Sequence, residues 1–391
     1  MNSQLKSFLV LLTILGVVLA LVGITYVNLR ISEEYPTGTD FTSSWESARR
    51  WVQRGETPYY GDFSLPLSSM LFLAPFGLME SLEARAIWMT LLEVSAILLG
   101  FFSLRLVKWK VSVFKAGFLC VFSLFWYYGL RSILSGQISL IVAVLLVLSI
   151  YSMIQKLDII AGLCLAVSLI KPTMAIVLVF FILFWSISTK RKEVVWSFLL
   201  ATLALILASF ALFPEWLVDW FIQSANFIRD SRSLDSPLSI LANSMPGLSK
   251  PMTIFFYSSI IVYMVIEWIL VMKKDDRWFL WTAMLTIVIS NLAGYRSGID
   301  HFVLMLPVIF LILQAWESRS QSNRQFLTIL VCLFFSVGFW SYFYLTDQIF
   351  SEPLWVYFVL PVFCLIGLWW TRWWFIRPSR LYMEELAQTI G

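Results

Sequence analysis

Long apolar runs recur from one end of the chain to the other, and they constrain its fold more than any other feature. The 391 residues are 60% hydrophobic and 13% charged, with a mean hydropathy of +0.82. Soluble domains are about half apolar and about a quarter charged, and one helical bilayer crossing needs roughly 20 apolar residues. The sequence therefore predicts an all-α, polytopic membrane protein with about 12 membrane segments in one membrane domain, residues 1–391. Spans are predicted near 8–29, 84–106, 112–130, 137–154, 194–213, 253–272, 278–293, 301–316, 326–344 and 354–375.

One further apolar run, 159–187, is interrupted by Lys171-Pro172. Basic clusters flank it at Lys156 and at 190–192, and both are cytoplasmic only if the chain crosses an even number of times between them. We therefore expect two short helices that meet at Lys171-Pro172. At 1.5 Å per residue, halves of about 12 and about 16 residues are shorter than a roughly 30 Å hydrocarbon core. The tip of this half-depth hairpin should place Lys171 inside the outer half of the membrane, where a charge indicates a candidate functional site.

With both chain ends in the cytoplasm, polar residues from distant loops fall on one extracytoplasmic side. Two of these loops are long, namely 30–83, which should carry short interfacial helices, and 214–252. Cations converging there would suit a phosphate-bearing lipid, and a carboxylate could accept a proton from an attacking hydroxyl. The candidate residues are Asp40, Arg131 and Gln137 around the turn LRSILSGQ, Lys171 at the hairpin tip, and Arg296, Asp300 and His301 in YRSGIDHF.

Each candidate also has a purely structural interpretation. Arg131 and Arg296 could snorkel at the membrane interface. His301 could bond backbone groups at a span boundary, and Asp40 could cap a helix that begins near Thr42. These alternatives stay open at the level of sequence.

Charged residues inside the predicted spans need partners, because an unpaired charge in an apolar interior is costly. Lys171 could belong to a structural ion pair instead of a binding site. Glu93 is expected to pair with a neighbouring polar group or to face the cavity, and Glu267 to pair with Lys273 or Lys274.

Several other chemistries leave no pattern in this sequence. A single histidine excludes His-rich zinc sites, and the HExxH, P-loop and GxSxG patterns are absent. The four cysteines lie in apolar runs and form no CxxC pair, and the acidic residues of the first loop have no spacing that names a metal. We expect no metal and no cofactor. A formal charge of +4 in so apolar a chain gives no sign of nucleic-acid binding.

The stretch DFTSSWESARRWVQRGETPYY (40–60) resembles the first external loop of glycosyltransferase family 87, polytopic enzymes that use polyprenyl-phosphate sugars. The matching features are Asp40, a helix with the small residue Ala48, then Gly55 and Pro58-Tyr59. Farther along, SGQISLIVAVLL (135–146) and AGLCLAVSLIKPTMAIVLVFF (161–181) resemble the Gly-Gln and Lys-Pro segments of the family.

This resemblance implies a C-type glycosyltransferase fold and a multi-pass protein of the plasma membrane with its active site on the extracytoplasmic side. It implies a metal-independent, inverting transfer of a hexose, mannose in characterised relatives, from a polyprenyl-phosphate donor to a hydroxyl of a lipid or glycan acceptor. Membrane lipids would be the other partners. In this scheme Asp40 is the base, Lys171 with Arg131, Arg296 or His301 binds the donor phosphate, and Tyr59, Gln137 and Asp300 line the substrate cavity.

Two other classes of function remain possible from the sequence. A transporter or flippase of lipid-linked saccharides would also need a charged intramembrane cavity. Such transporters usually contain two repeat halves with interrupted helices in matching positions, whereas this chain shows one interrupted hairpin. A structural subunit of an assembly is the third alternative.

Overall fold

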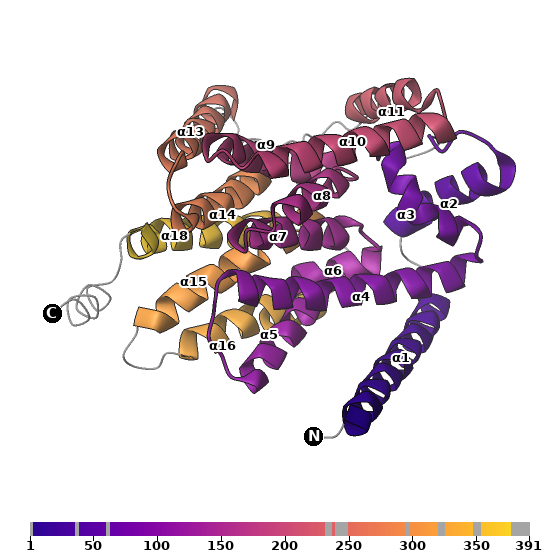
Figure 1. Cartoon of the computed structure of the whole chain (residues 1–391), viewed down its shortest axis with the longest axis horizontal. Helices are drawn as coiled ribbons and strands as arrows, with labels where there is room; N and C mark the ends of the chain where they lie inside the picture. Colours follow the sequence, from indigo (N-terminus) through magenta and orange to yellow (C-terminus); the bar gives the residue numbers. More distant parts are fainter. Residues whose placement is uncertain are drawn as a thin grey trace.

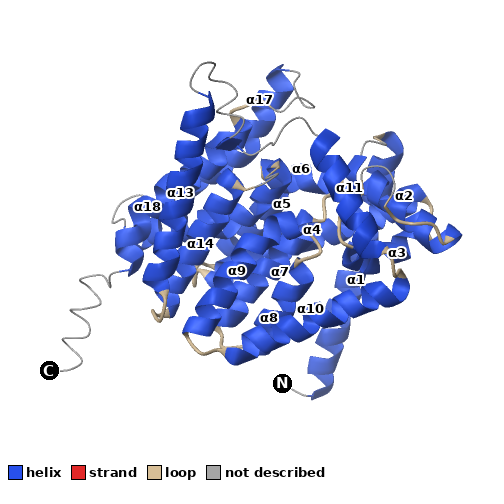
Figure 2. Cartoon of the chain, turned by 90° about the horizontal axis from the view of Figure 1, so that it is seen from above, coloured by secondary structure: helices blue, strands red, loops and turns tan. Residues whose placement is uncertain are grey.

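The structure, a computed structural model, shows a bundle of helices that lie side by side (Figure 1). In the part of the chain that it describes, all regular secondary structure is helical (Figure 2). Among the described residues, seven helices are long and apolar enough to cross a membrane, or eight if the bent pair at 113–135 is one span. This confirms the prediction of an all-α protein with several apolar helices. The described residues are 3–35, 39–59, 63–230, 237–238, 249–294, 298–319, 325–346 and 353–376.

Every predicted span corresponds to a helix or to a run of consecutive helices. Four of the membrane segments that the sequence predicts are not among the seven or eight candidate spans. They are α7, α8, α9 and α14, of 16, 11, 17 and 18 residues. The prediction of about 12 membrane segments is therefore not confirmed. The observed elements in these regions are α1 (Ser3–Glu34), α4 (Ser81–Leu106), α5 (Val113–Phe125), α6 (Tyr127–Ser135), α7 (Ser139–Ile154), α8 (Asp158–Ser168), α9 (Pro172–Ser188), α10 (Lys192–Leu212), α13 (Ser249–Val271), α14 (Asp276–Ala293), η2 (Ile299–Met305), α15 (Leu306–Arg319), α16 (Phe326–Leu333), η3 (Phe334–Gly338), α17 (Phe339–Thr346) and α18 (Val356–Ile376).

Each of the two long loops contains shorter helices or a shorter helix. In the first loop these are α2 (Thr39–Arg54), the 3₁₀ turn η1 (Leu67–Ser69) and α3 (Met70–Gly77), and in the second α11 (Trp216–Asp230). The α2 and α3 helices lie beside each other next to the start of α4, and α11 lies at the same end of the bundle (Figure 1). The first loop thus carries short helices outside the candidate spans, and their location at a membrane interface stays a prediction.

The interrupted run folds as two separate helices, α8 and α9. Pro172 is the first residue of α9, and Lys171 before it adopts a non-helical conformation with φ −129° and ψ 81°. A residue before proline avoids helical geometry, and proline fits the first helical position, so the dipeptide ends one helix and starts the next. At the far ends, Arg191 after α9 forms an ion pair with Asp158 at the start of α8. The two helices therefore run antiparallel, with Lys171 at the bend between them.

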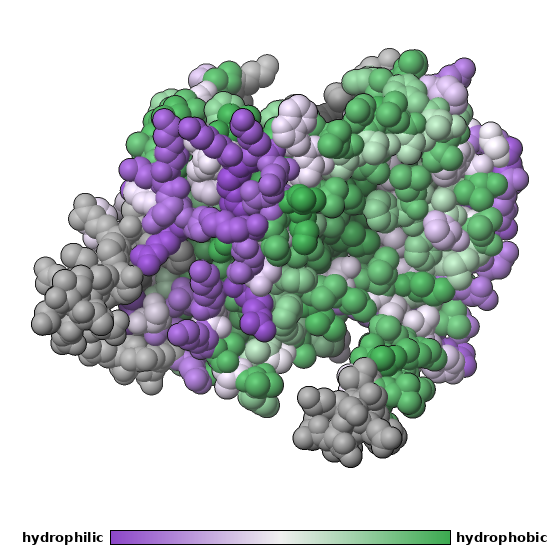
Figure 3. Space-filling model, viewed as in Figure 1, coloured by the Kyte–Doolittle hydropathy of each residue, from purple (hydrophilic) through white to green (hydrophobic). Residues whose placement is uncertain are grey.

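Four helices end on a lysine in the left-handed conformation, at φ between 53° and 62°. The position after a helix C-terminus often adopts this conformation, and a cation there interacts favourably with the negative end of the helix dipole. Lys156 also lies 3.1 Å from Asp276 at the start of α14. These helix ends lie together at one end of the bundle, where hydrophilic atoms gather (left in Figure 3). The four residues are Lys108, Lys156, Lys190 and Lys273.

The first helix, α1, contacts the bundle through a short polar patch near its C-terminal end. Asn28 donates hydrogen bonds to Thr90 and Glu93 of α4 at 3.1 and 3.0 Å, and Thr25 lies 3.0 Å from Thr90. Glu93 thus has a polar neighbour, one of the two outcomes expected from the sequence. Residues 11–24 of α1 are exposed, and the helix leans away from the bundle (Figure 1).

Glu267 has a different partner from the one predicted. Its carboxylate lies 2.9 Å from the guanidinium of Arg372 in α18, so the expected pairing with Lys273 or Lys274 is wrong. Both α13 and α18 pack against α14, which brings the arginine close to the C-terminal end of α13, where it also lies over the ring of Trp281. A planar guanidinium suits such a buried, stacked position better than an ammonium does.

The close packing of α8 on α10 depends on Gly162. A Cβ atom at this position would lie 2.5 Å from the carbonyl oxygen of Val194 and 2.8 Å from the amide nitrogen of Phe198. We expect Gly162→Ala to force the two helices apart and to lower the free energy of unfolding by about 1–3 kcal/mol. Thermal unfolding in detergent measures this change. The control is Gly117→Ala on α5, where a Cβ would meet nothing within 4 Å; equal stability losses in both variants would contradict the packing account.

Candidate functional site

Four segments that are distant in the sequence meet at the end of the bundle opposite the basic helix ends. They are the first turn of α2, the turn between α6 and α7, the break between α8 and α9, and the start of η2. Their side chains form a connected series in which Gln137 contacts both Asp40 and Lys171, and Lys171 contacts Asp300. The structure thus joins four of the predicted site residues into one polar cluster.

Lys171 is 9% exposed, and its ammonium has three protein acceptors. It donates to Ser139 Oγ at 2.7 Å and to Gln137 Oε1 at 3.3 Å, and it forms an ion pair with the carboxylate of Asp300. Ser139 Oγ in turn donates to Asp300 Oδ2 at 2.6 Å. An ammonium carries three hydrogens, so all of them are used and the charge is compensated.

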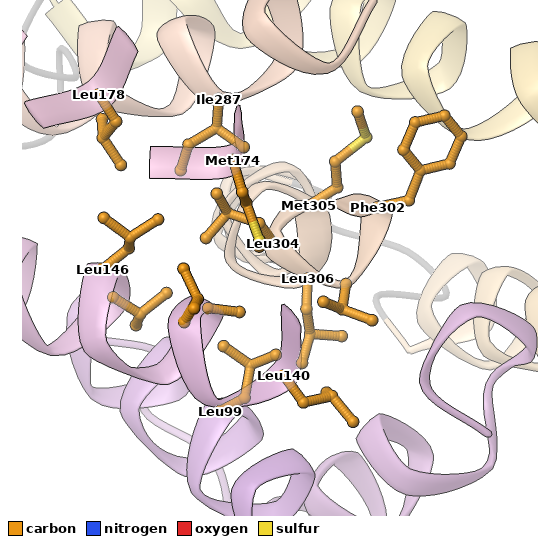
Figure 4. Close-up of a cluster of buried hydrophobic side chains, with 14 of the residues drawn as sticks. Leu99, Leu140, Leu146, Met174, Leu178, Ile287, Phe302, Leu304, Met305 and Leu306 are labelled. Atoms are coloured by element: carbon orange, nitrogen blue, oxygen red, sulfur yellow. The ribbon is translucent and has the colours of Figure 1, made fainter. Parts of the chain in front are cut away.

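The Asp300 carboxylate is held by an unusually long 3₁₀ helix, η2, of seven residues. Its apolar residues are buried on both sides: Leu304 lies beside Met174 of α9 (Figure 4), and the ring of Phe302 packs on that of Tyr128 in α6, with centroids 5.5 Å apart. This anchoring leaves Asp300 beside Lys171. The buried His301 follows, with Nε2 at 3.7 Å from Asp300 Oδ2, which is beyond hydrogen-bond distance.

Asp40 is the second residue of α2, which begins at Thr39, earlier than the expected start near Thr42. Its Oδ2 accepts a hydrogen bond of 2.6 Å from Gln137 Nε2. The side chain keeps a solvent-exposed face although protein atoms surround the rest of it, and its position in the first helical turn places a carboxylate at the positive end of the helix dipole. Asp40 therefore has an accessible face and one fixed contact.

Phe41, the residue after Asp40, fixes the position of the start of α2. Phe41 is 1% exposed and stacks on Trp88 of α4, with ring centroids 5.8 Å apart. The indole of Trp88 donates to the carbonyl of Gly136 at 2.9 Å. Gly136 has φ +74°, and a Cβ there would overlap Phe41 Cβ, so this turn requires glycine. The start of α2 is thus packed directly on the turn that carries Gln137.

The surroundings of Asp40 favour its protonated form. Partial burial among protein atoms raises the pKa of this carboxyl, and the negative charge of Asp300 raises it further. The hydrogen bond from Gln137 and the charges of Lys171 and Arg131 oppose this change without cancelling it. The result is a carboxylate that is more basic than an ordinary surface aspartate.

Residues 63–341, more than two thirds of the chain, match the sequence profile of glycosyltransferase family 87. The chain belongs to glycosyltransferase family 87. Family membership supports glycosyltransferase activity in a membrane protein. The matched region includes Gln137, Lys171, Asp300 and His301, whereas Asp40 precedes it. No curated protein matches the chain.

Two other predicted residues of this family 87 protein, Tyr59 and Arg296, are not part of the cluster that the structure describes. Tyr59 is buried against Phe63, and the neighbouring Thr57 donates to Asp219 of α11 at 2.9 Å, so this part of the first loop packs on the second. Burial and the charge of Asp219 raise the pKa of the Tyr59 phenol. Arg296 lies outside the described residues.

Arg131 and Ser139 complete the description of the site in this family 87 protein. Arg131, on α6, is half-buried and acts electrostatically on Asp40. Ser139 is a site residue that the sequence analysis missed. Its position at the first turn of a helix, two residues after Gly-Gln, was the available signal. Among the described residues, no group of three or more His, Cys, Asp or Glu side chains is placed to hold a metal ion.

A double-mutant cycle tests whether Lys171 and Asp300 compensate each other. Lys171→Met or Asp300→Asn alone leaves one buried charge without its counter-ion, and each should lower the free energy of unfolding by about 3 kcal/mol. The double variant should lose less than the sum of the two single losses, because neither charge then remains. Thermal unfolding in detergent measures all four proteins. Additive losses would show that the two side chains do not interact.

Proposed function

We propose that this family 87 protein transfers a hexose, with mannose as the first sugar to test, from a polyprenyl-phosphate carrier to a hydroxyl of a lipid or glycan acceptor, with inversion. The observation that carries the proposal is the linkage of the Asp40 carboxylate to the buried Lys171 ammonium through Gln137. A base and a cation held in one cluster suit a displacement in which a hydroxyl attacks and a phosphate leaves.

In this mechanism Asp40 accepts the proton of the acceptor hydroxyl. The hydroxyl oxygen forms a bond to the anomeric carbon, the bond from that carbon to the phosphate oxygen breaks, and its electron pair leaves with the polyprenyl phosphate. The raised pKa of Asp40 makes it a stronger base than a freely solvated aspartate. Its exposed face gives the acceptor access. No metal takes part in this proposal.

The phosphate gains negative charge as it leaves, and cations near the site would stabilise it. Lys171 has its three hydrogens in use, and Asp300 offsets its charge, so a phosphate oxygen must replace one existing acceptor. Gln137, at 3.3 Å the longest contact and uncharged, is the acceptor most easily replaced. Arg131 and His301 are the other described candidates for the phosphate, and Asp300 keeps Lys171 in place.

The distribution of charge supports a site on the extracytoplasmic side, and we propose the plasma membrane as its location. Helices α7 and α9 each run from the polar cluster to a basic end, at Lys156 and at Lys190 with Arg191. Basic residues that flank membrane spans are enriched on the cytoplasmic side. The cluster at the opposite end would then face outward, where a membrane-embedded lipid-phosphate donor and a lipid or glycan acceptor could meet.

Asp40→Asn tests the assignment of the base. Removal of a general base should lower the rate of transfer by about 10²- to 10⁴-fold, while binding of the lipid-phosphate donor stays within about twofold. The assay follows a radiolabelled polyprenyl-phosphate hexose in detergent with candidate lipid acceptors. The matched control is Glu46→Gln on the same helix, where the carboxylate pairs with Arg50. Transfer at the normal rate by Asp40→Asn would refute the mechanism, and lipid translocation without transfer by the parent protein would favour a flippase.

The transfer rate should fall when the pH is lowered. The pH at which it falls should be higher than the pKa typical of surface aspartates. The base must be ionised, so activity is present above the pKa of Asp40 and is lost as the pH falls through it. Because burial and Asp300 raise this pKa above the ordinary value of about 4, the acid limb moves upward with it. A pH profile of kcat/KM for the acceptor measures the limb. A rate that stays constant down to about pH 4 would contradict this environment of Asp40.

A further inference from the structure

We propose that Gln137 is a positioning residue, which orients the Asp40 carboxylate and couples that orientation to the occupancy of the donor site at Lys171. The inference rests on the proposed function, in which Asp40 is the base. It concerns a side chain that contacts neither substrate and acts through Asp40.

The two ends of the Gln137 amide face opposite charges. Its nitrogen donates to Asp40 Oδ2 at 2.6 Å, and its oxygen accepts from Lys171 Nζ at 3.3 Å. A flipped amide would turn its oxygen toward the carboxylate and its nitrogen toward the ammonium, and both contacts would be repulsive. The charges on the two sides therefore select a single orientation of the amide.

The backbone beneath Gln137 is equally constrained. The amide of Gln137 donates to the carbonyl of Ser132 at 2.9 Å, and that of Gly136 donates to Ile133 at 3.0 Å, which is the pattern of a glycine-terminated helix. The carbonyl of Gly136 also accepts from Trp88. The side chain of Gln137 thus projects from a fixed turn, and it can set the direction of an exposed partner side chain.

Asp40 is that partner. With Oδ2 engaged by Gln137, the second carboxylate oxygen is left to accept the proton of the acceptor hydroxyl. The charged groups that act on the carboxylate are Asp300, Lys171 and Arg131. Without Gln137, the carboxylate loses the hydrogen bond that fixes its orientation and favours its ionised form.

The contact of Gln137 with Lys171 supplies the coupling. An anionic phosphate oxygen forms a stronger, charge-assisted hydrogen bond with an ammonium than a neutral amide oxygen does. Donor phosphate at Lys171 therefore replaces Gln137 there and leaves the amide bound to Asp40 alone. Gln137 should then matter for turnover and for use of the acceptor, and little for donor affinity.

The experiment compares Gln137→Ala and the near-isosteric Gln137→Glu with the parent enzyme, as full-length proteins in detergent. Gln137→Ala should lower kcat by about 10-fold and move the acid limb of the pH profile upward by about half a pH unit. Gln137→Glu should move the limb further, because it places a second carboxylate beside Asp40. Affinity for a short-chain polyprenyl phosphate should stay within about twofold in Gln137→Ala. The control is Ser135→Ala on the same turn, whose hydroxyl bonds the Arg131 carbonyl.

The possible results separate this inference from the proposed function. If Asp40→Asn is inactive but neither Gln137 variant moves the acid limb, Asp40 remains the base and Gln137 is not its positioning residue. If Gln137→Ala loses affinity for the polyprenyl phosphate tenfold or more, the residue belongs to the donor site and the inference is overturned. If Asp40→Asn transfers sugar normally, the proposed function itself fails.

Discussion

The burial of one ammonium group, that of Lys171, organises the end of the bundle that carries the polar cluster. A cation in an apolar interior is stable only with acceptors for its hydrogens and a counter-ion for its charge. Ser139, Gln137 and Asp300 supply them, from segments that are otherwise unrelated in sequence. The break between α8 and α9 brings the lysine to this position, and the apolar anchoring of η2 brings the carboxylate to meet it. The site is therefore a consequence of satisfying one buried charge.

The side-chain amide of Gln137 connects this buried cation to the residue that we propose as the base. Gln137 is both an acceptor for Lys171 and a donor to Asp40, so the group that accepts a hydrogen bond from the cation also holds the proposed base. The packing of Phe41 on Gly136 and Trp88 holds the start of α2, which carries Asp40, against the turn that carries Gln137. In this arrangement a phosphate that approaches the lysine and a hydroxyl that approaches the aspartate are brought to neighbouring positions, which is the geometric condition for transfer between them.

The sequence predicts the elements well because local rules decide them. Lys171-Pro172 breaks a helix for steric reasons that are local to the dipeptide, and apolar runs of span length fold as helices in lipid. Local sequence does not predict which side chains on different helices are in contact, because this depends on the angles and rotations of the packed helices. The role of Ser139, the pairing of Glu267 with Arg372 and the packing of the Tyr59 segment on α11 all depend on such contacts. The number of membrane segments was also hard to predict, because α7, α8 and α9 are shorter than ordinary spans.

The most direct test of the account is a structure of the protein determined with a bound polyprenyl phosphate. The account predicts that the phosphate lies within hydrogen-bond distance of Lys171, on the side now occupied by the Gln137 oxygen, with the anomeric position between it and Asp40. A phosphate bound at the basic end of the bundle, or held at this end without contact to Lys171, would contradict it.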